Sequence, residues 1–169
     1  MLTFATLQLR IFYFFERSKS DIRREGLLRA FSTSIAVISM LGRAKENYNV
    51  MHYAPSHFGR IIIVAGIVVL KVLHSSFAQF VDFQSGKRSF NLTLSLLRNA
   101  SIENNDLHGR SSKILAQLWS FHSSLTPKND GDPNLKLKTR SSASVLHDAL
   151  WVWRERFRKE AASYIALSG

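Results

Sequence analysis

The chain has 169 residues, of which 46% are hydrophobic and 11% aromatic, so it is long enough for one domain and too apolar to be disordered. It contains no cysteine, which excludes disulfide bonds, thiolate metal sites and cysteine nucleophiles. An excess of 23 basic over 12 acidic residues gives a net charge of +11. Such a charge indicates either polyanionic partners or acidic regions elsewhere in a larger protein, and we favour the second interpretation.

The N-terminal segment 1–15 is apolar, but it lacks the basic start and the small-residue cleavage site of a secretory signal. Leu7, Ile11 and Phe14 recur at helical spacing. The segment therefore predicts a helix that contributes to the core.

A second helix is expected after a capping segment at 18–21. Its apolar stripe comprises Leu28, Phe31, Ile35, Ile38 and Leu41. Gly42 is a natural helix stop, and the polar, irregular residues 43–57 predict a loop.

The next landmark is an unbroken apolar run, Ile61–Leu70. Spanning a bilayer takes about 20 apolar residues, and Arg60 and Lys71 bracket this run too closely. A helix of about 58–74 that is buried on all sides is favoured. A strand remains open on length alone, because the run is rich in Ile and Val and Gly66 weakens a helix.

Two amphipathic helices are expected over residues 85–99 and from Asp106 onward, joined by a polar turn. A short helical turn that presses Phe77, Phe80 and Phe83 into the core should precede them. The residues expected to face inward are Phe90, Leu94 and Leu97 on the first helix, and Ile114, Leu118, Phe121 and Leu125 on the second. Asp106 is the expected N-cap of the second helix, and Trp119 should be buried between the two.

A flexible loop is predicted over 126–142, followed by a last helix. The expected core stripe of that helix comprises Leu146, Leu150, Trp153 and Phe157. Its other face carries the cations Arg154, Arg156, Arg158 and Lys159, which are candidate contacts for a polyanion. The alternative for these cations is simple solvation and pairing along the helix. The tryptophans Trp119, Trp151 and Trp153 fit packing positions better than a platform for stacking nucleobases.

No motif in the chain indicates catalysis. The six histidines lack the i, i+4 spacing with an intervening Glu of a helical zinc site. A nucleophile elbow, a complete phosphate loop and a dinucleotide fingerprint are also missing from the sequence. We therefore predict no catalytic, cofactor-binding or metal-ligating residue and no enzyme.

The stretch from Ile62 to Trp119 resembles the carboxy-terminal part of the regulatory region in fungal binuclear zinc-cluster transcription factors. The branch that regulates leucine biosynthesis and secreted proteases is the most similar. The residues that carry this resemblance are Phe90, Asn91, Leu97, Arg98, Asp106, Gly109, Arg110, Leu115, Gln117, Leu118 and Trp119. Weaker matches lie at 25–29 and 53–55, and 141–155 is similar to the terminal region of the family.

The resemblance implies an all-α, irregular bundle of about six helices, and it decides for a helix at 61–70. It implies a fragment of a larger helical regulatory domain over 1–162, with a tail at 163–169. The chain departs from the family pattern because it has neither the six-cysteine cluster that binds two zinc ions nor a heptad run, and because much of the preceding regulatory region is missing. Base-specific reading of DNA is therefore in doubt.

The predicted function is a non-catalytic regulatory domain of a nuclear transcription factor, truncated and without its zinc cluster. Expected partners are the transcription machinery or other parts of a parent factor, with only non-specific DNA contact and no membrane. The alternative is a basic helical module that binds nucleic acid or an anionic membrane by charge.

Overall fold

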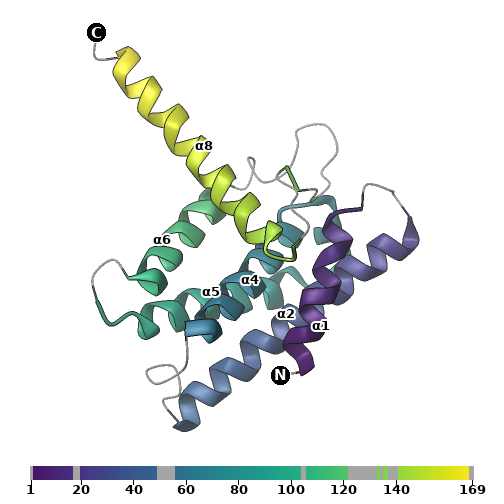
Figure 1. Ribbon diagram of the computed structural model, residues 1–169. Helices are drawn as coiled ribbons and strands as arrows, with labels where there is room; N and C mark the ends of the chain where they lie inside the picture. Colours follow the sequence, from purple (N-terminus) through teal and green to yellow (C-terminus); the bar gives the residue numbers. More distant parts are fainter. Residues whose placement is uncertain are drawn as a thin grey trace.

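The computed structural model describes residues 2–16, 20–48, 56–103, 106–121, 133, 135–136 and 141–167, including their side chains except at 45–48, 56 and 160–167. These residues form an all-α bundle, as predicted, with no strand among them (Figure 1). The elements are α1 (Leu2–Arg10), η1 (Ile11–Phe14), α2 (Asp21–Tyr48), α4 (Ser56–Leu73), η2 (Ser76–Phe80), α5 (Phe83–Ala100), α6 (Leu107–Ser120) and α8 (Ser144–Leu167), where η marks a 3₁₀ helix.

Helix α4 lies at the centre of the bundle, where it contacts α2, α5, α6 and α8. Every residue from Ile61 to Leu73 is buried, so the expected helix that is covered on all sides is confirmed. Gly66 fits this helix because α5 approaches it closely. A Cβ atom on Gly66 would lie 2.7 Å from Cγ2 of Thr93.

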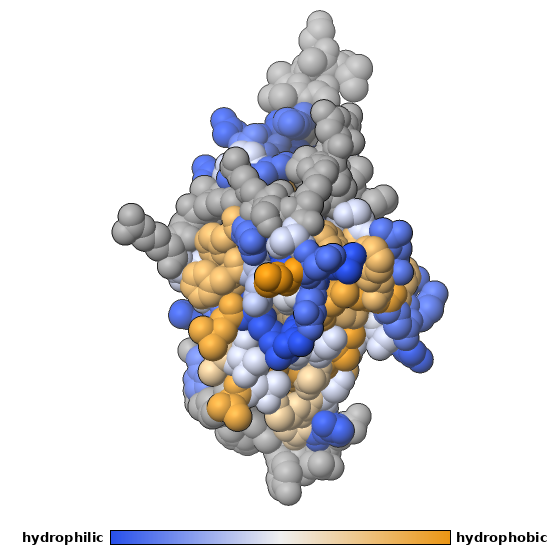
Figure 2. Space-filling view, turned by 90° about the vertical axis from the view of Figure 1, so that its right-hand side faces the viewer, coloured by the Kyte–Doolittle hydropathy of each residue, from blue (hydrophilic) through white to orange (hydrophobic). Residues whose placement is uncertain are grey.

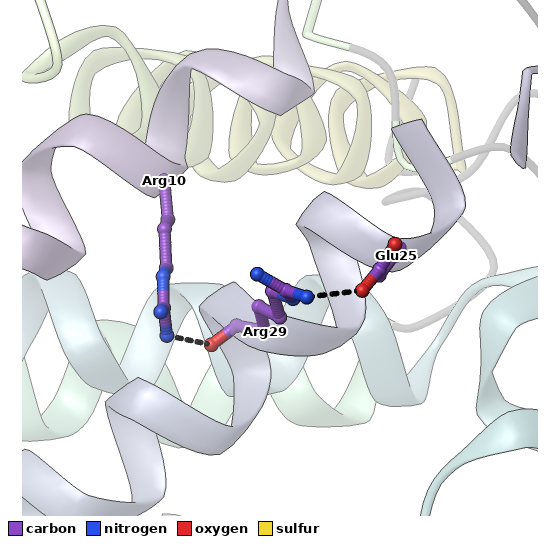
Figure 3. A network of polar contacts seen from close by, with 3 residues as sticks. All are labelled: Arg10, Glu25 and Arg29. Carbon is purple, nitrogen blue, oxygen red and sulfur yellow. Dashed lines mark hydrogen bonds and ion pairs between the residues drawn. The ribbon is translucent and has the colours of Figure 1, made fainter. Parts of the chain in front are cut away.

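The N-terminal helix and η1 pack on α2 as expected, with Leu7, Ile11 and Phe14 fully buried. A hydrogen bond joins α1 to α2, next to an ion pair within α2 (Figure 3). Arg10 Nη1 donates to the backbone oxygen of Arg29 at 3.1 Å, and the Arg29 guanidinium pairs with Glu25 on the preceding turn of α2. Segment 2–14 is therefore part of the bundle.

The predicted stop of α2 at Gly42 is wrong. The helix continues to Tyr48, and Gly42 is buried against α5, where its Cβ would lie 3.1 Å from Cδ2 of Leu92. This glycine allows a close approach of two helices instead of ending one. Of the loop predicted over 43–57, the first six residues are helical, the last two begin α4, and 49–55 lie outside the described residues.

The predicted stripe on α2 is partly wrong. Phe31, Ile38 and Leu41 are buried, whereas Leu28 and Ile35 are only half-buried. The buried face also includes Leu27, Ala30, Ser34 and Val37. The face is rotated because α2 packs against α1 on one side and against α4 and α5 on another.

One stretch of the described chain, Asp21–Ala44 in α2, is long and apolar enough to cross a bilayer by length and composition. Half of its most apolar window is buried inside the bundle. The core helix of a soluble protein has the same properties.

Of the aromatic residues predicted to press into the core at η2 and the start of α5, only Phe77 packs against it. Phe80 is 51% exposed and Phe83 is 40% exposed, while Phe77 is half-buried. Guanidinium groups from the start of α2 lie over two of these rings: Arg23 is 5.9 Å from the centroid of Phe77, and Arg24 is 5.5 Å from that of Phe80. Phe80 thus has a cation–π contact at the surface in place of core packing.

The last helix packs through a face other than the predicted one. Its buried residues are Ser144, Val145, Asp148, Ala149 and Val152, whereas Leu150 is 37% and Phe157 40% exposed. Leu146 and Trp153 are half-buried, and Trp151, expected at a packing position, is 41% exposed. The expected division at 162 stays a prediction, and α8 itself runs to Leu167.

Most of the predicted flexible loop at 126–142 lies outside the described residues. Its described part is anchored: Leu135 is 4% exposed and belongs to the hydrophobic core. Figure 2 shows the face on the right-hand side of Figure 1, where hydrophobic residues form separate patches divided by hydrophilic ones.

Candidate functional site

The hydrophobic residues of the sequence motif at 90–119 come together where α5 meets α6. Phe90, Leu97, Leu115 and Leu118 are each at most 1% exposed. The polar members Asn91, Arg98 and Arg110 are exposed on the surface. The structure therefore divides the motif into a core set and a solvent-facing set and does not assemble it as one site.

Trp119 stacks on Phe90 with ring centroids 4.6 Å apart and is tilted against His74 at 4.7 Å. It packs against the core but is only half-buried, so the prediction that it is buried between the two helices is only partly correct. The reason is an open cleft of about 510 Å³ beside the ring, lined by Leu73, His74, Phe83, Lys87 and Trp119.

Asp106 is the N-cap of α6, as expected from the sequence. Its Oδ1 accepts hydrogen bonds from the Gly109 N–H at 2.7 Å and from Ser101 Oγ at 2.9 Å, and its Oδ2 accepts from the Ile102 N–H at 2.9 Å. The Gly109 N–H, followed by the other donors, lowers the pKa of Asp106 to about 2. The carboxylate therefore fixes the turn between α5 and α6.

Gln117 on α6 and Phe121 just after it contact α8. Trp153 Nε1 donates to Gln117 Oε1 on α6 at 2.7 Å, and the Arg156 guanidinium lies 5.4 Å from the ring centroid of Phe121. Gln117, a motif residue, thus has an observed contact that the sequence did not predict. It connects the motif to the helix that carries the candidate cations.

A buried ion pair joins α4 to α8. Lys71 Nζ lies 2.6 Å from Asp148 Oδ2, and each side chain is 1% exposed. Asp148 Oδ1 accepts from the Lys136 backbone N–H at 2.6 Å. Burial lowers the pKa of Lys71 below its ordinary value, and the charge of Asp148 opposes that change.

Sequence reasoning missed this pair. It used Lys71 only as the charged boundary of an apolar run and did not single out Asp148. A signal was present, because a lysine within a helix that is covered on all sides needs a counter-charge. Its partner could not be identified from spacing.

The four candidate cations on α8, Arg154, Arg156, Arg158 and Lys159, are all exposed. Arg158 lies 3.3 Å from Glu155 on the same helix, and Arg156 contacts Phe121 as described above. These local contacts leave the guanidinium groups at the surface, where they can meet an anionic partner.

No group of three or more His, Cys, Asp or Glu side chains that could hold a metal occurs within the described residues. The cleft beside Trp119 is lined by aromatic and aliphatic groups with a single lysine. A second open hollow, of about 320 Å³, lies between α1 and α2 and is lined by Leu2, Thr3, Thr6, Arg10, Ser32, Thr33 and Ala36. These linings provide hydrogen-bonding and apolar surface and contain no pair of carboxylates.

The chain is similar to a known yeast protein, "Regulatory protein LEU3" of Saccharomyces cerevisiae. The two are 25% identical over 147 residues, which is 79% of this chain and 17% of the yeast protein. No protein-family model matches the chain, and no solved structure matches it.

This similarity supports a distant relationship to a regulatory protein. The chain spans about a sixth of the length of this relative, so the relative's whole activity is not carried over with the fold.

Proposed function

We propose that this chain is a non-catalytic regulatory module of a transcription regulator that acts in the nucleus through protein contacts. The observation that carries the proposal is the similarity to Regulatory protein LEU3 over 79% of the chain. We place the module with the fungal binuclear zinc-cluster regulators, in the carboxy-terminal part of their regulatory region. The 169 residues contain no cysteine, so they cannot themselves form the zinc cluster of such regulators.

The two ionisable groups with shifted pKa values support a structural role. Asp106 caps α6, and Lys71 is paired with Asp148, so each shift has a local packing or capping cause. Neither group lines the cleft beside Trp119. The expected partners are other segments of a parent factor or the transcription machinery, and no membrane is involved.

The test is a reporter assay with the chain fused to an unrelated DNA-binding domain. We expect the fusion to change reporter transcription relative to that domain alone at equal protein level. The matched control is a fusion with Asp148→Asn, which should destabilise the bundle by about 3–5 kcal/mol and should therefore weaken the effect. An unchanged reporter with the intact chain would reject the regulatory function.

A second candidate function is binding of polyanions by charge, and the exposed cations of α8 favour it. Such binding draws its free energy from released counterions, so it weakens steeply with salt and does not distinguish base sequences. Changing Arg154, Arg156, Arg158 and Lys159 to Gln should remove most binding to any duplex equally. Sequence-selective binding that persists at about 200 mM salt would favour a dedicated nucleic-acid module over the regulatory one.

A further inference from the structure

Helix α8 has one apolar face that the bundle buries and a second that it covers only in part, since Leu146 and Trp153 pack against the core and are half-buried. The covered face contains Val145, Ala149 and Val152. The second face, here named the α8 stripe, consists of Leu146, Leu150, Trp153 and Phe157, spaced i, i+4, i+7 and i+11. Two of its members are 37% and 40% exposed although the sequence pattern is that of a core stripe. Such spacing is typical of a helix that packs along another helix.

The α8 stripe lies on the side of α8 that is nearest to α6. Leu146, Ala149 and Leu150 of α8 line a hollow of about 20 Å³ together with residues of α4 and α6, among them Ile63, Ile67 and Leu115. This is about the space of one water molecule, and the lining is almost wholly apolar. The hollow therefore suits the end of one aliphatic side chain and is too small for a ligand.

Beyond this hollow the stripe continues up α8. The rings of Trp153 and Phe157 lie 4.8 Å apart, and Trp153 is held by its hydrogen bond to Gln117. In Figure 1 the C-terminal half of α8 rises away from the other helices. The stripe is thus an apolar strip about 16 Å long that starts in a hollow and ends on a projecting helix.

Cations border this strip. Arg154 and Arg158 each follow a stripe aromatic by one residue, which places them along one edge. Arg156 lies at the other edge, over Phe121. On α6, Lys113 is exposed one turn before Gln117. Among the described side chains of α8, the carboxylates are Asp148, which is buried, and Glu155, which pairs with Arg158.

We propose that the exposed part of the α8 stripe, at Leu150 and Phe157, binds an acidic amphipathic helix of another protein. An apolar ridge of that helix would lie on the α8 stripe, and its Asp and Glu side chains would meet the bordering cations. A second copy of this chain would bring the same cations against one another, which opposes self-pairing. A duplex would satisfy the cations and leave the stripe uncovered. The proposal rests on the proposed function for its biological setting, and its test is read separately from the reporter.

The probe is a labelled peptide of about 18 residues with Leu and Phe at i, i+4, i+7 and i+11 and Glu or Asp on its flanks. Its control has the same composition with the apolar residues scattered. Fluorescence anisotropy with the full chain should give at least tenfold tighter binding for the amphipathic peptide. Equal binding of the two peptides would mean that charge alone acts, which overturns the proposal.

Variants on α8 locate the contact. Leu150→Gln and Phe157→Gln should each weaken peptide binding at least fivefold. Trp151→Gln is the matched control, since Trp151 is 41% exposed on the same helix but outside the stripe, and it should change binding less than twofold. A loss with Trp151→Gln as large as with Phe157→Gln would place the peptide elsewhere.

The cations are tested in pairs. Arg154→Gln with Arg158→Gln should weaken binding at least fivefold at low salt and flatten its salt dependence. The control pair on α5, Arg88→Gln with Arg98→Gln, removes the same charge from exposed positions and should leave affinity nearly unchanged. If the two pairs of substitutions weakened peptide binding equally, binding would depend on net charge alone, and the docking site would be rejected.

A measurement on the unaltered protein keeps the proposal testable if a variant fails to fold. A nitroxide on the peptide should broaden the indole N–H signal of Trp153 more strongly than that of Trp151.

Dimerisation through the stripe, seen in sedimentation and abolished by Phe157→Gln, would assign the face to a second copy and overturn the proposal. Peptide binding with a silent reporter would reject the proposed function and leave this site standing.

Discussion

Lys71 Nζ and Asp148 Oδ2 lie 2.6 Å apart with both side chains 1% exposed, and they join positions 77 residues apart in the chain. The pair connects the central helix α4 to α8. Through Lys136, whose N–H donates to the other carboxylate oxygen, it also anchors the segment before α8. A buried pair of this kind adds little net stability, but breaking it is costly because one charge remains without its partner.

Asp148→Asn should lower the free energy of unfolding by about 3–5 kcal/mol, because it leaves the Lys71 ammonium buried without a counter-charge. Adding Lys71→Met in the same protein removes that charge and should recover most of the loss. Urea denaturation of the parent, the single variant and the double variant measures both effects. A double variant no more stable than Asp148→Asn would contradict this account.

Asp106 predicts a dependence of stability on acid pH. Its folded pKa of about 2 lies below the ordinary value of about 3.9, so the unfolded chain binds more protons between these values. The stabilisation from Asp106 is therefore fully present above about pH 3.9 and is lost as the pH falls through about 2.

Asp106→Asn isolates this contribution, because Asn also caps helices but does not titrate. The variant should be less stable than the parent at neutral pH, and the difference should shrink toward zero as the pH approaches 2. Urea midpoints of both proteins across the acid range provide the comparison. A difference that is constant with pH would show that the carboxylate charge does not stabilise the cap.

Gly66→Ala should destabilise the bundle by about 1–3 kcal/mol, the usual cost of overpacking, although alanine favours helix formation. The new Cβ would lie 2.7 Å from Cγ2 of Thr93. Thr93 cannot turn away freely, because its Oγ1 donates to the Ser89 backbone oxygen at 3.0 Å.

Thr93→Ser removes the clashing methyl group and keeps the hydroxyl. Its effect should couple favourably to Gly66→Ala, so the double variant should be more stable than the sum of the two single changes predicts. Thermal unfolding of the four proteins gives the coupling. Strict additivity would mean that α4 and α5 separate to accommodate the alanine.

Trp119→Ala should cost less than the roughly 3–5 kcal/mol typical of a fully buried aromatic, because the indole is half-buried beside an open cleft. Phe90→Ala should reach that full range, since Phe90 is 1% exposed. A double-mutant cycle should return a coupling of about 0.5–1.5 kcal/mol for the stacked rings. A larger loss at Trp119 than at Phe90 would contradict the observed burial.

Local features of the sequence predicted most of the helices. The spacing of Leu7, Ile11 and Phe14 indicated α1 and η1, and Asp106 marked the start of α6. These signals depend on residues within about four positions of one another, which is the range of the backbone hydrogen bonds of a helix. The stop at Gly42 failed because a glycine that permits close helix packing looks the same in sequence as one that ends a helix.

The sequence by itself determined that the chain is helical, lacks thiolate chemistry and carries a strong positive charge. The tertiary structure decided which apolar face of α8 is covered, and it brought Asp148 to Lys71. The reason is physical: periodicity shows that a helix has an apolar face, but burial depends on which helices pack against it. That packing depends on contacts between residues that are distant in the chain, and a local sequence pattern does not specify such contacts.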